Sequence, residues 1–262
     1  MMDEERFFFW SPEERDLRKA LKDLRDDYGC AALKFETEAE GASFEDIRYY
    51  MNLALGQIAI KVKIGGVDAR NDIRELLKIG VKGIIAPMVE SPYGLKNFIA
   101  ALTEMASPEQ YQYIFKGFNV ETITTYHQID DIFALPEIKQ IDKISIGRSD
   151  LSGSMGLKPD DEPVMKIVKE ITEKAHQIGL AVSVGGGITP GNARRISEQI
   201  KPESINTRNL GFDLSRVKDP GLSIQKALEF EITLLEHRSK QAKAAFDSLQ
   251  KRVAVLRERM KQ

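Results

Sequence analysis

The sequence predicts an α/β fold of the TIM (β/α)8 barrel type, followed by a long C-terminal helix. Short apolar runs alternate with amphipathic helical patterns, and the connections between them are short. Repeated βα units of this kind imply parallel strands joined by right-handed crossovers. About 210 residues of such units fit a closed barrel better than an open doubly wound sheet. No G-x-G-x-x-G follows the first predicted strand, which disfavours a dinucleotide-binding sheet.

The helices are predicted from their start and stop signals. The first covers residues 11–29, where Ser11 is a suitable N-cap, Pro12 and two acids follow, and Gly29 marks the end. Further helical patterns cover residues 43–55, 68–80, 92–105, 125–135, 161–179 and 190–200.

Seven strands are predicted between these helices. They lie at residues 30–36, 57–64, 82–87, within 111–121, and at 141–147, 180–186 and 203–209. A TIM barrel needs an eighth strand. The candidate for it is the segment "RFFFW", residues 6–10.

The C-terminal segment has a different pattern. Residues 222–262 contain neither Pro nor Gly, and apolar residues recur there with alternating spacings of four and three. The stripe consists of Leu228, Ile232, Leu235, Ala242, Phe246, Leu249, Val253, Leu256 and Met260, with Ser239 as a polar break. Such a heptad pattern is typical of a helix that packs along a partner helix. We therefore divide the chain into a catalytic barrel, residues 1–217, and a helical extension, residues 218–262, that joins copies into a homo-oligomer. The alternative is a helix folded back on its own barrel.

Composition narrows the class of protein. Hydrophobic residues make up 42% and charged residues 30%, and the formal net charge is -2. This balance predicts no nucleic-acid partner and no attraction to anionic membranes. No apolar run approaches the ~20 residues that span a bilayer. The acidic N-terminus is unlike a signal peptide, and the single cysteine, Cys30, excludes an intrachain disulfide, so we expect a cytoplasmic protein.

Polar residues gather where the predicted strands end, which is the end of a TIM barrel that carries the chemistry. In strand order, the candidates are Glu36, Glu38, Lys61, Lys63, Glu90, Asn119, Glu121, Arg148, Asp150 and Gly186, followed by Asn206, Thr207 and Arg208. Lys61 and Lys63 lie two residues apart and therefore share a strand face, which we expect to be the barrel interior.

Glu121 and Asp150 follow neighbouring strands at similar depth, and they suggest a metal site. Adjacent carboxylates repel each other and take up protons unless a cation intervenes. A chain with one cysteine and three scattered histidines favours a hard, oxygen-bound ion, Mg2+ or Mn2+. Two protein ligands leave positions for water and substrate. Lys63 and Arg148 are then suited to clamp a carboxylate or to stabilise an enolate.

Simpler structural roles remain open for several of these residues. Asp150 is also suited to cap a helix start, because carboxylates accept backbone N–H bonds there. One of the two lysines is a possible structural partner for Glu36. The glycines of "VGGGI" allow either close approach of a ligand to the backbone or a phosphate cradle.

The segments "APMVES" and "FNVETITTYHQIDDIFALPEIKQIDKISIGRSDLSGSMG" resemble the HpcH/HpaI aldolase and citrate lyase β-subunit family. The resemblance extends over residues 30–210. It implies a TIM barrel that binds Mg2+ or a similar ion and makes or breaks carbon–carbon bonds beside an enolate. It also implies that Glu121 and Asp150 are the metal ligands. Lys63 falls where many members carry an arginine that contacts the substrate's oxo oxygen.

Three departures from the family pattern indicate a divergent member. Ala39 stands where the aldolases carry their catalytic histidine, so the base is left to Glu38 or a metal-bound water. Lys63 in place of Arg keeps the charge and loses the planar fork. Arg148 stands where pyruvate aldolases usually have proline.

Taken together, these observations predict a metal-dependent lyase or aldolase acting on a 2-oxo acid or related carboxylate. Lys63, Arg148 and Glu38 are expected to be catalytic. Glu36, Lys61, Glu90, Asn119 and Gly186 are expected to contact the substrate. One alternative is a lyase acting on an acyl-CoA thioester, and another is a barrel that binds a metabolite without turnover while its helical extension recruits a partner.

Overall fold

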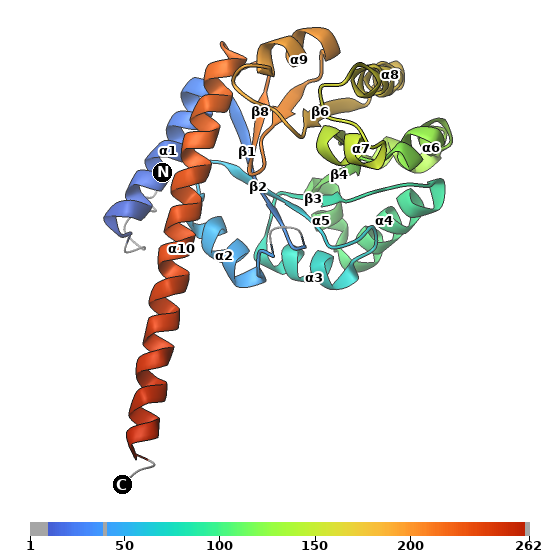
Figure 1. The fold of residues 1–262 in the computed structure, drawn as a ribbon. Coiled ribbons are helices and arrows are strands. Elements are labelled where there is room, and N and C mark those ends of the chain that lie inside the picture. Colours follow the sequence, from blue (N-terminus) through green and yellow to red (C-terminus); the bar gives the residue numbers. More distant parts are fainter. Residues whose placement is uncertain (1–9, 39–40, 260–262) are drawn as a thin grey trace.

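Eight strands close into a barrel in chain order, as the computed structural model in Figure 1 shows. The structure describes residues 10–38 and 41–259. The strands are β1 (Cys30–Glu36), β2 (Ala59–Lys63), β3 (Gly83–Ala86), β4 (Phe115–Val120), β5 (Lys143–Gly147), β6 (Ala181–Gly185), β7 (Ser204–Asn206) and β8 (Leu210–Asp213). From β1 to β7, each strand pairs in parallel with the next strand along the chain, which confirms the predicted α/β barrel.

The eighth strand differs from the prediction. β8 pairs antiparallel with both β7 and β1, and only residues 207–209 connect it to β7. A parallel neighbour would need a crossover of a dozen or more residues, so a connection this short forces a hairpin. The assignment of residues 6–10 to the eighth strand is therefore wrong. Residues 6–9 lie outside the described part of the chain.

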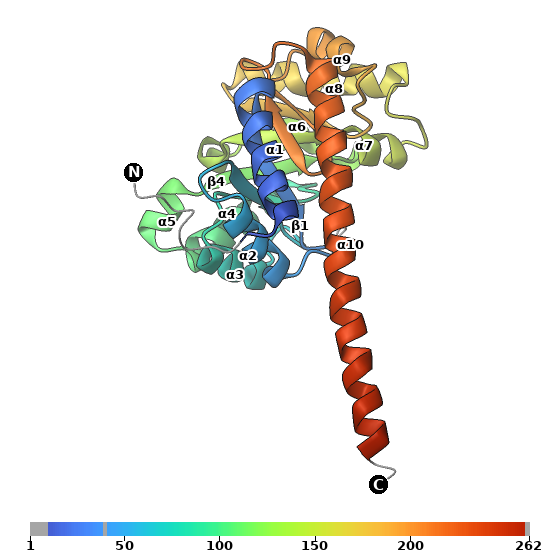
Figure 2. The ribbon, with the colours of Figure 1, turned by 90° about the vertical axis from the view of Figure 1, so that its left-hand side faces the viewer.

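Helices cover the outside of the barrel (Figures 1 and 2). The predicted ones are α1 (Pro12–Tyr28), α2 (Phe44–Leu53), α3 (Arg70–Ile79), α4 (Pro92–Met105), α6 (Ile123–Phe133), α8 (Glu162–Gln177) and α9 (Ala193–Ile200). Ser11 and Glu14 form a capping box at the start of α1, and Gly29 ends it in the left-handed conformation, as its sequence predicts. Three short helices were not predicted: α5 (Pro108–Tyr113), the 3-10 helix η2 (Pro136–Gln140) and α7 (Arg148–Ser154).

The long helix α10 (Pro220–Arg259) begins just after the boundary predicted at residue 217. Its first half packs against α1 and α9, and buries Ile224, Ala227, Phe230 and Leu234. Its second half extends away from the barrel (Figure 2). Over its first half the helix thus folds back on its own barrel, the alternative stated above.

The described apolar stripe on this helix is exposed, and its first residue, Leu228, also lines the cavity at the carboxyl end of the barrel. Leu228, Ile232, Leu235 and Phe246 are exposed by 36%, 58%, 55% and 60%. The side chains of Leu249, Val253, Leu256 and Met260 lie outside the described part.

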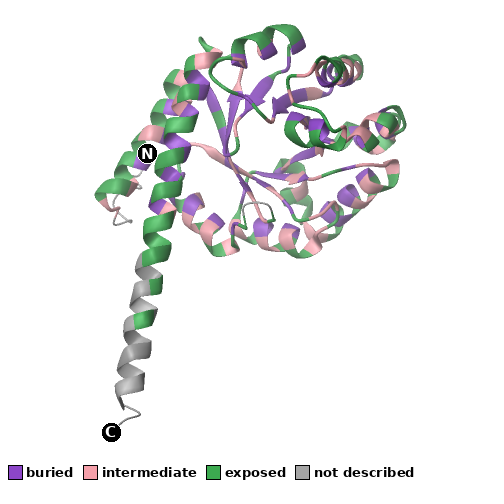
Figure 3. Ribbon diagram, in the orientation of Figure 1, coloured by how far each residue is buried: buried purple, intermediate pink, exposed green. Residues whose placement is uncertain are grey.

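The hydrophobic core lies between the barrel wall and the surrounding helices (Figure 3). Outward-facing strand residues such as Leu33, Val62 and Val182 are fully buried there. The barrel interior, by contrast, is lined by polar and charged side chains as well as apolar ones. None of the described helices has the length and apolar character needed to cross a membrane.

Candidate active site at the carboxyl end of the barrel

A cavity of about 340 Å3 opens at the carboxyl ends of the strands. We call it the mouth cavity. It brings together nine of the predicted site residues: Glu36, Lys63, Asn119, Glu121, Asp150, Gly186, Asn206, Thr207 and Arg208. Because these residues come from six different strands or the turns that follow them, only the closed barrel assembles them.

Glu121 follows β4 directly, and its side chain is almost fully buried. Its Oε1 accepts a hydrogen bond from the Met88 backbone N–H at 3.1 Å, and its Oε2 accepts one from Asn119 Nδ2 at 3.0 Å. Met88 has a φ of 42°, which is uncommon for a residue with a side chain. Gly147 leaves room for this carboxylate, because a Cβ there would lie 3.0 Å from Glu121 Oε2. The Glu121 carboxylate is thus fixed by two donors.

The ionisation of the Glu121 carboxyl group depends on nearby charges. Burial raises the pKa of its carboxyl group, and the nearby Asp150 carboxylate raises it further. The Lys63 ammonium and the two hydrogen bonds act in the opposite direction, but the net pKa remains above the ordinary value. Asp150 lies on the first turn of α7, exposed to the mouth cavity. Positive charge placed between the two carboxylates would favour the ionised form of both.

The donor set fits a hard divalent ion. Within the described residues no group of three or more His, Cys, Asp or Glu is placed to hold a metal. Glu121 and Asp150 both line the mouth cavity, and they would be the two protein ligands of such an ion. Each Glu121 oxygen receives one hydrogen bond and keeps a further lone pair. Mg2+ is commonly held in this way, by one or two carboxylates with the remaining positions left to water and substrate oxygens.

The opposite wall of the mouth cavity is an ion-pair cluster. Glu36 and Lys63 are register partners on β1 and β2, and Lys63 Nζ lies 3.3 Å from Glu36 Oε1. Arg208 Nη1 lies 3.9 Å from the same oxygen. The structural partner considered for Glu36 is thus Lys63, while Lys61 lies deeper in the barrel. Lys63 stands between Glu36 and Glu121 and acts electrostatically on the latter.

Gly186 explains the glycine cluster after β6. Its φ is 77°, and a Cβ built on it would lie 2.4 Å from the backbone nitrogen of Ser149. Only glycine permits this approach of the β6 loop to the start of α7. The same packing shapes the cavity beside Asp150, since Ser149, Asp150 and Gly186 all line it.

Four predicted site residues lie elsewhere. Arg148 is fully buried and directed away from the mouth cavity, because its Nη1 donates to Asp160 Oδ1 at 2.8 Å and to the Pro159 carbonyl at 3.2 Å. The structure therefore gives it no place as a substrate clamp. Lys61 does point into the barrel, with its Nζ 3.2 Å from the Phe115 ring centroid.

Glu38 and Glu90 are also outside the cavity lining. Glu38 is exposed, with its carboxylate beside Gly65. Glu90 Oε1 accepts a hydrogen bond at 2.5 Å from Thr122 Oγ1, the N-cap of α6. Ala39, the position of the family histidine, lies outside the described residues.

Sequence reasoning missed several residues of the cavity lining. Lys34 donates from Nζ to the Thr207 carbonyl at 3.0 Å, and its spacing of two residues from Glu36 is the signal that would have identified it. Glu231, on α10, accepts hydrogen bonds from Thr207 Oγ1 at 2.6 Å and from the Asn209 backbone at 2.7 Å. No local signal pointed to Glu231, because α10 was expected to lie apart from the barrel.

Comparison with known proteins identifies the family of this chain. The model of the family described as HpcH/HpaI aldolase/citrate lyase matches residues 48–220. The chain belongs to this family. The match spans β2 to β8 and includes Glu121, Asp150 and Lys63.

One relative within the family is a protein from Rhizorhabdus wittichii named hydroxypyruvate/pyruvate aldolase. It is 27% identical over 49% of this chain, and the match spans 64% of the relative's length.

Among solved structures, similar folds include an HpcH/HpaI aldolase from Desulfitobacterium hafniense, with a TM-score of 0.57 and 17% identity over 70% of this chain and 78% of that one. A family protein from Burkholderia cenocepacia has a TM-score of 0.58 and 14% identity over 87% and 98%. The citrate synthase SbnG has a TM-score of 0.57 and 18% identity over 86% and 91%.

Proposed function

We propose that this HpcH/HpaI family member is a divalent-metal-dependent carbon–carbon lyase, an aldolase, that acts on a 2-oxo acid through an enolate. The observation that carries the proposal is the placement of Glu121 and Asp150 on one cavity beside Lys63. Family membership supports the reaction class, and the name of the Rhizorhabdus relative supports a pyruvate-like substrate.

In this proposal Glu121 and Asp150 hold Mg2+ or Mn2+. When bound, the ion supplies Lewis-acid stabilisation of negative charge on the substrate's oxygen atoms. The chain supplies the rest of the electrostatics. Asn119 and the Met88 N–H keep Glu121 in one orientation, so little reorganisation is needed during the reaction. Lys63 donates to the oxo oxygen as negative charge develops there.

Formation of the enolate requires a base that removes a proton from the substrate. We assign this role to Glu36, on the same wall of the cavity as Lys63. It lines the mouth cavity, and its Oε2 is buried without a hydrogen-bond partner in the described part of the chain. Lys63 and Arg208 hold its other oxygen. Glu36 replaces Glu38 in this assignment because the structure leaves Glu38 exposed.

The test is exchange of the pyruvate methyl protons with deuterated water, followed by NMR with Mg2+ or Mn2+ present. We expect exchange by the wild type and at least about a 100-fold loss in Glu36→Gln, the size of effect typical of a general base. Glu90→Gln, outside the cavity, is the matched control. A panel of oxo acids, aldehydes and CoA esters then identifies the carbon–carbon reaction. Ligand binding without exchange or turnover across that panel would contradict the proposal.

We also propose that α10 joins copies of the chain. Ile232, Leu235 and Phe246 form an exposed apolar stripe with coiled-coil spacing, which a partner helix of the same kind would cover. Leu235→Lys should lower the mass measured by light scattering and leave the fold intact. Leu234 is the matched control, because it is 1% exposed and packs on the barrel. Leu234→Ala should cost about 2–5 kcal/mol of stability instead. An unchanged mass in Leu235→Lys would contradict this role.

A further inference from the structure

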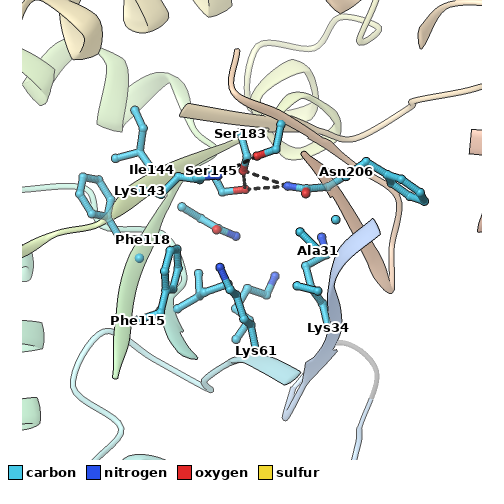
Figure 4. Close-up of a pocket in the computed structure, with 18 of the residues that line it drawn as sticks. Ala31, Lys34, Lys61, Phe115, Phe118, Lys143, Ile144, Ser145, Ser183 and Asn206 are labelled. Carbon is cyan, nitrogen blue, oxygen red and sulfur yellow. Dashed lines mark hydrogen bonds between the residues drawn. The ribbon is translucent and has the colours of Figure 1, made fainter. Parts of the chain in front are cut away.

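The barrel interior is open beneath the mouth cavity. A second cavity, of about 170 Å3, fills it, and we call it the chamber (Figure 4). The chamber and the mouth cavity share seven lining residues, so one leads into the other. These residues are Lys34, Glu36, Lys63, Asn119, Ser145, Asn206 and Arg208.

The chamber exists because small residues face inward. TIM barrels are usually filled by layers of bulky branched side chains. Here the chamber is lined by Ala32, Gly117, Ser145, Ser183, Ser204 and Gly211. Several of these residues belong to a polar network, because Asn206 Nδ2 donates to Ser183 Oγ at 2.9 Å and Ser183 Oγ donates to Ser145 Oγ at 2.8 Å. A polar, open interior is suited to a polar ligand.

The charge of the chamber is unbalanced. Its lining includes the cations Lys34, Lys61, Lys63, Lys143 and Arg208, but only two carboxylates, Glu36 and Asp213. Glu36 already pairs with Lys63 and Arg208.

Within the described residues neither Lys61 nor Lys143 forms an ion pair. Lys143 Nζ donates to Ser204 Oγ at 3.0 Å, and Lys61 Nζ lies against the Phe115 ring. Figure 4 shows Lys61, Ser145, Ser183 and Asn206 around the central space.

This arrangement is unfavourable without an anion. The pKa of Lys61 is lowered to about 8, chiefly by burial and also by Lys143 and Lys34, and only Asp142 acts to raise it. Burial also lowers the pKa of Lys143, while Glu203 and Asp213 act to raise it. Partly buried cations without a directly paired carboxylate are unfavourable for a fold. An anion between Lys61 and Lys143 would remove that cost.

We propose that the chamber binds an anionic group between Lys61 and Lys143. Lys61 lies two residues below Lys63 on β2, a separation of about 7 Å along the strand. A short dicarboxylate spans this distance, so one end can reach Lys63 at the mouth while the other reaches the chamber lysines.

The first experiment measures binding of glutarate to the full chain by calorimetry in EDTA. We expect glutarate to bind the wild type at least tenfold more tightly than Lys61→Met. Lys169→Met, at an exposed position on α8, should behave as the wild type. Because an anion raises the pKa of Lys61, binding at pH 8 should take up protons, and Lys61→Met should lose this uptake. Equal glutarate affinity in the wild type and Lys61→Met would overturn the proposal that the chamber binds an anion.

A second measurement needs no variant. Reductive methylation of the wild type, read out for each lysine by mass spectrometry, should show Lys61 and Lys143 protected by glutarate and Lys169 unprotected. Unchanged labelling of Lys61 would also overturn the proposal.

Because the calorimetry is metal-free, failure of the metal-lyase proposal would leave the binding result intact.

Discussion

The mouth cavity and the chamber lie one above the other in the same barrel and carry opposite chemistry. In the mouth, the carboxylates of Glu121 and Asp150 line one cavity and interact electrostatically. In the chamber, Lys143 donates to Ser204 and Lys61 lies against the Phe115 ring. Two residues along each strand are enough to change from one layer to the next. A barrel interior can therefore favour cations at one depth along its axis and anions at another.

This contrast has a consequence for where each ligand binds. The chamber lysines would repel a divalent cation, so the proposed metal ion would be confined to the carboxylate pair. The same lysines would attract an anion. The ion pair of Glu36 and Lys63 lies at the border between the two layers.

The largest expected effect comes from removing the negative charge of the mouth. Glu121→Gln should weaken Mn2+ binding at least about 100-fold, equivalent to about 2.7 kcal/mol, because a charged oxygen ligand is lost. Binding is measured by calorimetry or by the electron paramagnetic resonance signal of free Mn2+. Wild-type affinity should fall as the pH drops through the raised pKa of Glu121, since the proton competes with the metal. Glu90→Gln should bind as the wild type, and tight Mn2+ binding by Glu121→Gln would refute the metal site.

A smaller effect, on the stability of the protein, is expected from adding a side chain beside the mouth cavity. Gly186→Ala should destabilise the protein by about 2–3 kcal/mol, because it combines a left-handed backbone with overlap against Ser149. Gly156 is the matched control, since its φ is 68° and a Cβ there meets nothing within 4 Å. Gly156→Ala should cost only about 1–2 kcal/mol, the backbone part alone. Chemical denaturation measures both, and equal losses would show that the contact at Gly186 does not matter.

The smallest effect concerns the charge of the chamber. The pKa of Lys61 is lowered to about 8 in the fold, so the unfolded chain holds its proton more tightly. Stability should therefore rise with pH from about 8 toward the ordinary lysine value, and the full penalty should be present at pH 7. Lys61→Met removes the penalty and should raise the Tm at pH 7 by about 2–4 °C, which corresponds to about 1 kcal/mol. A Tm of Lys61→Met below that of the wild type would show that the Lys61 ammonium is stabilised in the fold.

The sequence was sufficient for the features that depend on local pattern. Glu121 and Asp150 each follow a strand with clear alternation, and the strand ends of a parallel barrel meet at one face. The helix caps of α1 were readable for the same reason. Lys61 and Lys63 faced the interior as their spacing of two residues required.

Other features depend on distant partners and left no local signal. Arg148 is turned away from the cavity because the short helix α7 begins at this residue and Asp160 captures its guanidinium. β8 has four residues, too few for a pattern of its own, and its direction follows from the three-residue connection to β7. Glu231 binds this hairpin from a helix that the heptad pattern assigned entirely to oligomerisation.

The hairpin of β7 and β8 also constrains the order of folding. The Lys34 backbone N–H donates to the Asn209 carbonyl at 2.6 Å, and Asn209 Nδ2 donates back to the Lys34 carbonyl at 3.0 Å. These bonds join parts of the chain that are far apart in sequence, so they add a large loop-closure cost to the search for the native state. Since Glu231 fixes the hairpin, the wall that carries Lys34 and Glu36 is completed only after the start of α10 has been synthesised. The site would thus be among the last regions to mature on the ribosome.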